Sequence, residues 1–303
     1  KRQPAANIEE REMIKPHGSE QLTPKIVNTD EERVALLDSA KSMKKMTVNS
    51  AAAANLVMLG AGYFTPVEGF MGKNDVIAVA NNMRLESGLF WPTPVVNLTN
   101  QEVDFKEGDT IALIDPNVEG DQIIAIQNVD KIEELNSEEI DNIVLQVFGT
   151  KDISHPGVQT FYEQGNKLIS GDVKVLNFSY FEKDFGETFR TAMQIRASIE
   201  SKGLTNVVAY QTRNPMHRAH EELCRMAADR VNADGILIHM SSDQKIIDTV
   251  NKIAPEHLEL NIKNYKNMVG KIKNSGSICL GKYAVMAMTD YGVPGSNHVL
   301  PTN

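Results

Sequence analysis

A ten-residue segment in the second half of the chain concentrates side chains that donate hydrogen bonds to anions. It reads Gln211-Thr212-Arg213-Asn214-Pro215-Met216-His217-Arg218-Ala219-His220. The planar guanidinium of Arg213 suits a phosphate or sulfate group, and the side-chain amides of Gln211 and Asn214 are neutral donors. The segment holds no strong nucleophile. Its residue types therefore favour anion binding and charge stabilisation over covalent catalysis.

Two histidines of this segment are spaced to lie on one face of a helix. His217 and His220 are three residues apart, and Pro215 is suited to the first turn of a helix. A helix begins with unpaired backbone N–H groups and the positive end of its dipole, so an anion is favoured there. Two alternatives stay open. One is a solvated polar loop with two surface histidines, and the other is a zinc site with His239 as a further ligand.

The segments around this loop predict the scaffold that positions it. We expect a helix over residues 189–202 and a buried strand over 206–210. A helix over 217–231 and a strand over 235–239 follow the loop. Strand, loop, helix and strand form one βαβ unit of a parallel sheet. Ligands of such sheets bind at the carboxyl ends of the strands, which is where the polar loop begins.

The first part of the chain shows a different pattern. We expect a disordered tail over residues 1–12, a helix over 29–46 that is capped by Thr29 or Asp30, and a helix within 47–59. Gly60 and Gly62 have the spacing of a dinucleotide loop, but the third glycine and the strand–loop–helix context are missing, so this motif carries little weight.

Short apolar runs between turn residues then predict a small mixed-β domain. The expected strands cover residues 94–98, 110–114, 122–129 and 143–148. After the βαβ unit, helices are expected at 242–252 and 264–274 and strands at 257–262 and 277–280. The expected fold class is α/β, with a mixed-β N-terminal domain.

Composition narrows the class of protein. The 303 residues suit two domains, and 41 % hydrophobic with 23 % charged residues is ordinary for a soluble globular protein. No apolar run reaches the length of a membrane span, and no secretory signal is apparent. The net charge of −9 argues against nucleic-acid binding, and we interpret the acidic residues between 102 and 141 as a solvated face.

Cysteine usage excludes a cysteine-based zinc site. Cys224 and Cys279 are the two cysteines, and neither belongs to a Cys-x-x-Cys pair. Both lie in apolar-patterned segments, so we expect them to be buried as small hydrophobic residues, and we expect a cytoplasmic compartment.

Residues 211–221 resemble the signature of ATP sulfurylases (sulfate adenylyltransferases), whose nucleotidyltransferase domain uses a His-x-x-His turn on the phosphates of ATP. Further segments are similar to the PUA-like N-terminal domain of that family, namely residues 59–71, 91–95, 148–150 and 155–158. The resemblance covers about residues 13–240. It implies a PUA-like domain over 13–180 and part of a nucleotidyltransferase domain over 181–240.

The resemblance implies a reaction of ATP with sulfate that gives adenylylsulfate and pyrophosphate, with Mg²⁺ accompanying ATP. It implies that sulfate is bound by Gln211 and Arg213. It also implies that the catalytic loop consists of Thr212, Arg213 and Asn214. His217 and His220 would stabilise charge on the phosphates, and Gln211, Arg213 and Asn214 would also contact ATP. We expect a homo-oligomer without nucleic-acid or membrane partners.

After Met240 the family pattern stops, and its second signature, Gly-Arg-Asp-His-Ala-Gly, has no match. Residues 241–303 instead resemble a fragment of histidinol dehydrogenase. That resemblance implies acid–base roles for Glu256 and His257, zinc binding by Asp290 and substrate contact by His298. The other zinc ligands and the cofactor site of that family are absent, so we expect neither zinc nor NAD. The chain therefore resembles a chimera, and an inactive protein that keeps an anion- or nucleotide-binding loop is the main alternative to an adenylyltransferase. The second alternative is a zinc- and NAD-dependent histidinol dehydrogenase fragment.

Overall fold

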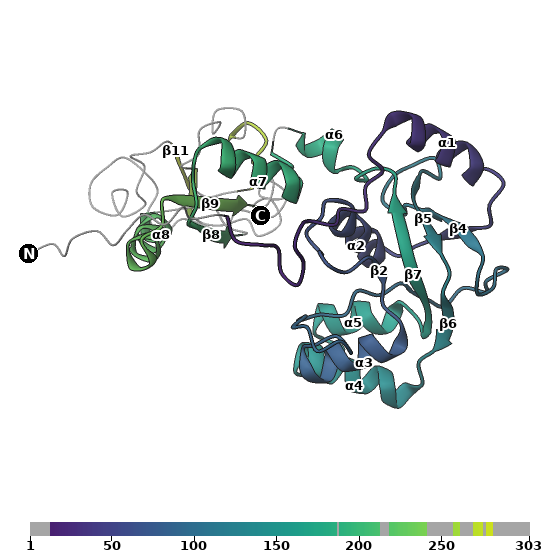
Figure 1. Cartoon of the computed structure of the whole chain (residues 1–303). Helices are drawn as coiled ribbons and strands as arrows, with labels where there is room; N and C mark the ends of the chain where they lie inside the picture. The colour runs from purple at the N-terminus through teal and green to yellow at the C-terminus, as the bar shows by residue number, and fades with distance from the viewer. Residues whose placement is uncertain are drawn as a thin grey trace, which may run out of the picture. The chain divides into compact units, whose positions relative to one another are not determined.

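The computed structural model describes residues 13–186, 188–212, 218–240, 257–260, 269–274 and 277–280. The expected tail over residues 1–12 lies outside this part of the chain. Two compact units are present: Lys15–Ser198 forms one, and Ile199–Asn303 together with Lys1–Ile14 forms the other (Figure 1). Among the described residues, no helix is long and apolar enough to cross a membrane.

A seven-stranded mixed sheet lies at the centre of the 15–198 unit. Its strands are β1 (Lys45–Thr47), β2 (Gly69–Phe70), β3 (Leu98–Thr99), β4 (Thr110–Ile114), β5 (Ile123–Asn128), β6 (Lys131–Glu134) and β7 (Lys167–Val175). The long strand β7 pairs antiparallel with β2, β3, β5 and β6. β1 runs parallel to β4, and β4 and β5 form an antiparallel pair. The expected mixed-β domain is therefore confirmed. The strand expected over 94–98 is wrong except at its end, because only Leu98 of these residues lies in a strand.

Gly171 allows the backbones of β2 and of the end of β5 to come very close to β7. Its φ of 138° lies in the region that only glycine adopts readily. A Cβ at this position would lie 1.9 Å from the carbonyl oxygen of Asn128, and a Cβ on Gly69 would lie 2.1 Å from the carbonyl oxygen of Gly171. The three backbones thus approach each other so closely that side chains are excluded.

Seven helices lie wholly or partly in this unit: α1 (Asp30–Ala40), α2 (Ser50–Gly60), α3 (Lys73–Asn82), α4 (Ser137–Phe148), α5 (Pro156–Glu163), α6 (Phe181–Phe185) and α7 (Ala192–Ser201). The Thr29 hydroxyl accepts a hydrogen bond from the N–H of Glu32, which confirms the expected cap of α1. The prediction that this helix reaches residue 46 is wrong, because Lys45–Thr47 pairs with β4. Gly60 ends a helix, which is not the context of a dinucleotide loop.

The expected strand over residues 143–148 is wrong, because these residues form the last turns of α4. Asn136 and Glu139 cap this helix reciprocally: each side chain accepts a hydrogen bond from the backbone N–H of the other residue. Ile143 and Val144 are buried on its inner side. A short apolar run fits a strand and a buried helix face equally well, and here the run lies in a helix whose first turn is stabilised by the capping box.

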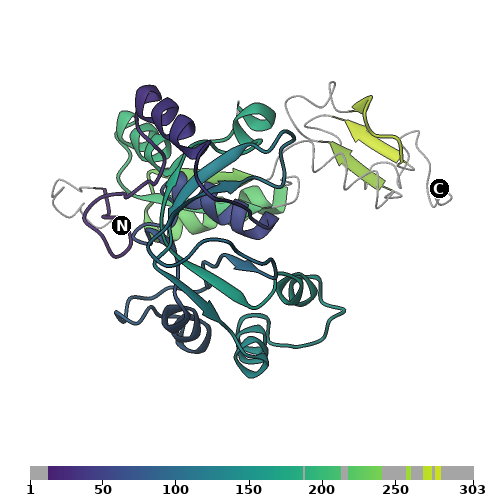
Figure 2. The same cartoon turned by 90° about the vertical axis from the view of Figure 1, so that its right-hand side faces the viewer.

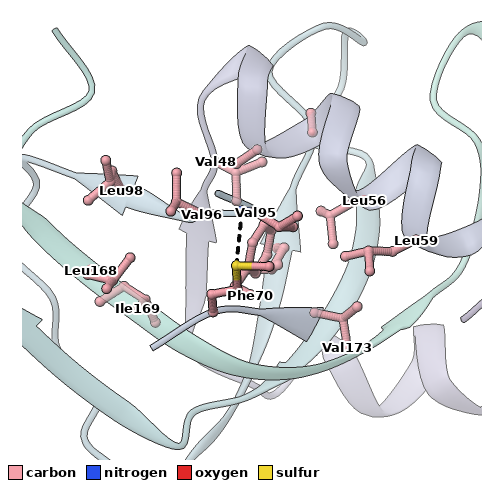
Figure 3. Close-up of a cluster of buried hydrophobic side chains, with 14 of the residues drawn as sticks. Val48, Leu56, Leu59, Phe70, Val95, Val96, Leu98, Leu168, Ile169 and Val173 are labelled. Carbon is pink, nitrogen blue, oxygen red and sulfur yellow. Dashed lines mark hydrogen bonds between the residues drawn. The ribbon is translucent and has the colours of Figure 1, made fainter. Parts of the chain in front are cut away.

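The core of the unit forms between α2 and the sheet (Figure 3). Leu56 and Leu59 of α2 lie over Val173 of β7, and Leu168 and Ile169 of the same strand are fully buried. Each fully buried side chain of this size contributes about 1.5–3 kcal/mol to the free energy of unfolding. Further core residues from the loops and short strands are Val48, Phe70, Val95, Val96 and Leu98.

The second unit begins with the predicted βαβ arrangement. It consists of β8 (Val207–Thr212), α8 (Arg218–Val231) and β9 (Gly235–Met240), and β8 and β9 are parallel. The expectation of a parallel sheet in this region is therefore confirmed. β10 (His257–Leu260) and β11 (Ser277–Leu280) form a second parallel pair, drawn in yellow-green and yellow in Figure 2. The helix expected over 242–252 lies outside the described residues, as do residues 264–268 of the helix expected over 264–274. In the described stretch 269–274 only Val269 is helical, so the prediction that the helix continues to residue 274 is wrong.

Candidate functional site

The carboxyl ends of β8 and β9 lie side by side. The register pairs Gln211 with His239 and Thr212 with Met240. Gln211 is exposed, whereas Thr212 is only 9 % exposed. The strand end therefore presents one solvated amide and one largely buried hydroxyl at the edge of the sheet where ligands bind in parallel α/β folds.

The first turn of α8 brings His220 back onto β8. The helix is described from Arg218 onward, and the expected start at His217 lies outside the described residues. The imidazole ring of His220 contacts the phenol ring of Tyr210, with 5.7 Å between the ring centroids and an interplanar angle of 43°. This contact joins the strand end to the helix start across the five residues 213–217.

Three residues assigned to the site, Arg213, Asn214 and His217, lie outside the described residues. Their roles stay predictions, as does the zinc alternative, because the side chain of His239 is not described either. Within the described ranges, no group of three histidine, cysteine or acidic side chains is close enough to hold a metal ion.

The amino ends of the same strands are fixed by Asp234. Its carboxylate accepts hydrogen bonds from the backbone N–H groups of Thr205 at 2.8 Å and Asn206 at 2.9 Å, and from the Thr205 hydroxyl at 2.9 Å. The Asn206 side chain in turn donates to the carbonyl oxygen of Val231 at 2.8 Å. The hydrogen bonds from Thr205 and Asn206 lower the pKa of Asp234. This network holds the register of β8 and β9.

Helix α8 has one face against the strands and one toward solvent. Cys224 is buried on the inner face, as its sequence context predicted. The side chains of Leu223 and Met226 are 52 % and 61 % exposed, and Glu221 pairs with Arg225 at 2.6 Å on the surface. The inner face of the helix is thus occupied by small residues and by His220.

The residues implied by the histidinol dehydrogenase resemblance are mostly outside the described part. This holds for Glu256, Asp290 and His298, so their roles stay predictions. His257 opens β10, and its backbone pairs with Ser277 of β11.

Two residues of the site were missed in the sequence. Tyr210 lies two positions before Thr212, and this period-two spacing places both on one face of β8. Asp234 directly precedes β9, where aspartate commonly binds backbone N–H groups of a turn. Both signals are local, but neither identifies the partner residue.

Two parts of the chain match two different protein families. Residues 14–178 match the PUA-like domain family, and residues 192–303 match the histidinol dehydrogenase family. The second match begins well before residue 241, and it includes the βαβ unit.

Curated relatives carry the name sulfate adenylyltransferase. The protein from Alcanivorax borkumensis is 51 % identical over 228 residues, which is 75 % of this chain and 57 % of the relative. The protein from Allochromatium vinosum is 48 % identical over the same shares. The chain thus spans little more than half the length of these relatives.

A solved structure shares the fold. It is described as a hexameric APS kinase from Thiobacillus denitrificans, and it superposes with a TM-score of 0.58 at 18 % sequence identity. The match covers 89 % of this chain and 57 % of that one. At this level of identity the likeness supports the α/β architecture alone.

Proposed function

Since the chain belongs to the PUA-like domain family through residues 14–178 and is similar to sulfate adenylyltransferases over three quarters of its length, we propose that it carries the front part of a sulfate adenylyltransferase. The proposed domains are a PUA-like domain over 13–180, part of a nucleotidyltransferase domain over 181–240 and a histidinol dehydrogenase-like fragment over 241–303. The proposed substrates are ATP and sulfate, and the products are adenylylsulfate and pyrophosphate.

The proposed reaction is a direct displacement at phosphorus. A sulfate oxygen forms a bond to the α-phosphorus of ATP, while the bond from that phosphorus to the α,β-bridging oxygen breaks. The electron pair of the broken bond leaves with pyrophosphate. Because both reactants are anions, the protein accelerates the step by bringing them together and by stabilising the charge that develops.

Each side chain of the loop has a proposed task. Gln211 and Arg213 bind the sulfate oxygens, and Arg213 with Asn214 also reaches the nucleotide. Thr212 completes the catalytic loop together with these two residues. His217 and His220 donate to the phosphate oxygens that gain charge as pyrophosphate departs. A helix N-terminus supports the same charge through its free backbone N–H groups.

In this proposal, Mg²⁺ is bound by the phosphates of ATP and not by the protein. The loop residues are hydrogen-bond donors, whereas Mg²⁺ prefers carboxylate and phosphate oxygens. The donor set therefore fits a metal ion that arrives with ATP, not one held by the protein. Bound in that way, Mg²⁺ supplies positive charge to the phosphates.

One observation carries the proposal most directly. The parallel βαβ unit places Gln211 and Thr212 at a strand end, and the Tyr210–His220 contact holds the first turn of α8 beside that strand. This arrangement supports the proposal, because it brings described residues from both sides of the loop to one end of β8.

The proposal is tested by pyrophosphate-dependent formation of ATP from adenylylsulfate. The wild-type chain is expected to form ATP, and Arg213→Ala is expected to lose activity. Arg225→Ala, which removes an exposed arginine of α8, is the matched control and should retain activity. If none of the three forms ATP, the same samples are tested for adenylylsulfate binding by calorimetry. Arg213-dependent binding without turnover would favour the inactive anion-binding protein.

Oligomerisation is part of the same proposal. The structurally similar APS kinase is described as hexameric, and we propose that this chain also forms a homo-oligomer. Light scattering coupled to size-exclusion chromatography measures the mass directly, and a mass of one chain would contradict this point.

A further inference from the structure

A pocket of about 370 Å³ lies in the PUA-like domain, and none of the described residues assigned to the proposed reaction lines it. It is formed within the 15–198 unit where β2, β7, the start of α3 and the start of β6 meet. Its volume is in the range of small-molecule sites. Neither the proposed adenylyl transfer nor the family match assigns it a role.

Acidic side chains predominate in the lining of this pocket. The lining contains six carboxylates and two lysines. Three of the carboxylates have partners: Glu133 accepts from the N–H of Lys73, Asp75 accepts from the N–H of Glu86, and Glu68 pairs with Lys25. The Lys73 ammonium is occupied as well, since it lies 2.7 Å from Glu139.

The other three carboxylates of the lining have no such partner among the described residues. In the described part of the chain, the side chains of Glu86, Asp130 and Asp172 form no hydrogen bond or ion pair. Partial desolvation raises the pKa of Asp172, and its neighbours Glu68 and Asp130 add to this effect against the opposing charge of Lys25. Of the two lining lysines, only Lys131 remains to offset these charges.

A buried hydroxyl also lines the pocket. Ser170 of β7 is only 4 % exposed, and no hydrogen bond of its Oγ is found among the described residues. Gly72, which also lines the pocket, has no side chain, and a Cβ there would lie 3.7 Å from this Oγ. A buried hydroxyl without a partner is costly unless water or a ligand satisfies it. The Oγ of Ser170 is not fully sealed from solvent, so its partner can be water or an occupant of the pocket.

The arrangement favours an organic cation over a metal ion. A metal ion needs several oxygen ligands within about 2.0–2.6 Å of one point. In the described ranges no three acidic, histidine or cysteine side chains converge in that way. Two half-buried apolar residues, Val67 and Leu85, also line the pocket. Separated oxygen acceptors with apolar surface between them match separated ammonium groups joined by methylene chains.

We propose that this pocket binds a small aliphatic diamine or polyamine, with Asp172 and Asp130 accepting from its ammonium groups and Ser170 offering a further oxygen. The methylene chain lies against Val67 and Leu85. Such a site would give the PUA-like domain a ligand of its own, and it does not depend on the proposed adenylyl transfer.

The test is calorimetric titration of the full chain with putrescine, a diamine of the same charge as Mg²⁺. Saturable binding of one putrescine per chain is expected, and an equal concentration of Mg²⁺ should not displace it. Asp172→Asn should weaken the affinity for putrescine about tenfold. Ser170→Ala, which leaves the net charge unchanged, should weaken it about threefold. Glu119→Gln, which removes an exposed carboxylate outside the pocket, is the charge-matched control and should bind as the wild type does.

Three results would overturn the proposal: no saturable binding, equal weakening by Glu119→Gln and Asp172→Asn, or displacement by the equal concentration of Mg²⁺. The last two would show general attraction of cations to an acidic surface. Circular dichroism confirms that each variant is folded. If Asp172→Asn is not, Ser170→Ala and Asp130→Asn provide the same comparison.

Discussion

The imidazole of His220 lies against the phenol ring of Tyr210, with 5.7 Å between the ring centroids. One ring belongs to the first turn of α8 and the other to β8, so the contact spans the loop that carries the proposed chemistry. A ring pair of this kind is worth about 0.5–1.5 kcal/mol beyond its buried area. Tyr210 is therefore a positioning residue for His220.

Removal of the Tyr210 ring should release His220 from its position. For Tyr210→Leu we expect the NMR signals of the His220 ring protons to lose the ring-current shift, and ATP formation from adenylylsulfate to fall about ten- to hundredfold. Tyr210→Phe keeps the ring and should retain both properties. Unchanged His220 signals in Tyr210→Leu would contradict the positioning role, whether or not the chain turns over.

Loss of the Asp234 carboxylate should loosen the amino ends of β8 and β9. In Asp234→Asn, amide hydrogen exchange at Thr205 and Asn206 should become faster at neutral pH, because the charged acceptor of both N–H groups is gone. Asp229→Asn, at an exposed position of α8, is the matched control and should exchange as the wild type does.

The protection by Asp234 should depend on pH. Its folded-state pKa is lowered by the hydrogen bonds from Thr205 and Asn206. A group with a lowered pKa contributes stability above its unfolded pKa, which is about 3.9 for aspartate, and loses it as the pH falls through the folded value. The difference between wild type and Asp234→Asn should thus be complete at neutral pH and shrink in acid. Urea titrations at neutral and at acidic pH measure the free energies of unfolding of both proteins. A difference between them that grows in acid would contradict a lowered pKa of Asp234.

The capping box of α4 should be measurable in the stability of the 15–198 unit. Asn136→Ala removes the acceptor for the N–H of Glu139 and should lower the free energy of unfolding by about 1 kcal/mol. Asn100→Ala, at an exposed loop position, is the comparison and should change it by less than about 0.5 kcal/mol. An equal effect of the two changes would mean that the box does not stabilise the helix.

Gly171→Ala should destabilise the unit more than any surface change. The added Cβ would lie 1.9 Å from the Asn128 carbonyl oxygen, at a φ of 138°. We expect a loss of more than about 3 kcal/mol, seen as a lower thermal midpoint or as failure to fold. Gly120→Ala tests the conformational part alone, because its φ is also positive but nothing lies within 4 Å of the added Cβ. A similar loss in both variants would show that the close backbone approach is unimportant.

The sequence by itself determined the features that depend on local patterns. The order of β8, α8 and β9 followed from apolar runs and a helix start signal, and residue types limited the cap of α1 to Thr29 or Asp30. The residue types of the loop indicated an anion site, since donors without a nucleophile have few other uses. Resemblance at the level of motifs then predicted the PUA-like domain that the family comparison shows.

Only the tertiary structure decided the features that depend on distant partners. Residues 143–148 are helical because α4 packs an apolar side onto the domain, and an apolar run of this length has no period that excludes a strand. The convergence of four strands on β7 depends on Gly171 meeting Asn128, which lies far away in the chain. The contacts of Tyr210 with His220 and of Asp234 with Thr205 are likewise fixed by packing. Spacing predicts which face a side chain occupies, and the fold alone supplies the partner on the other side.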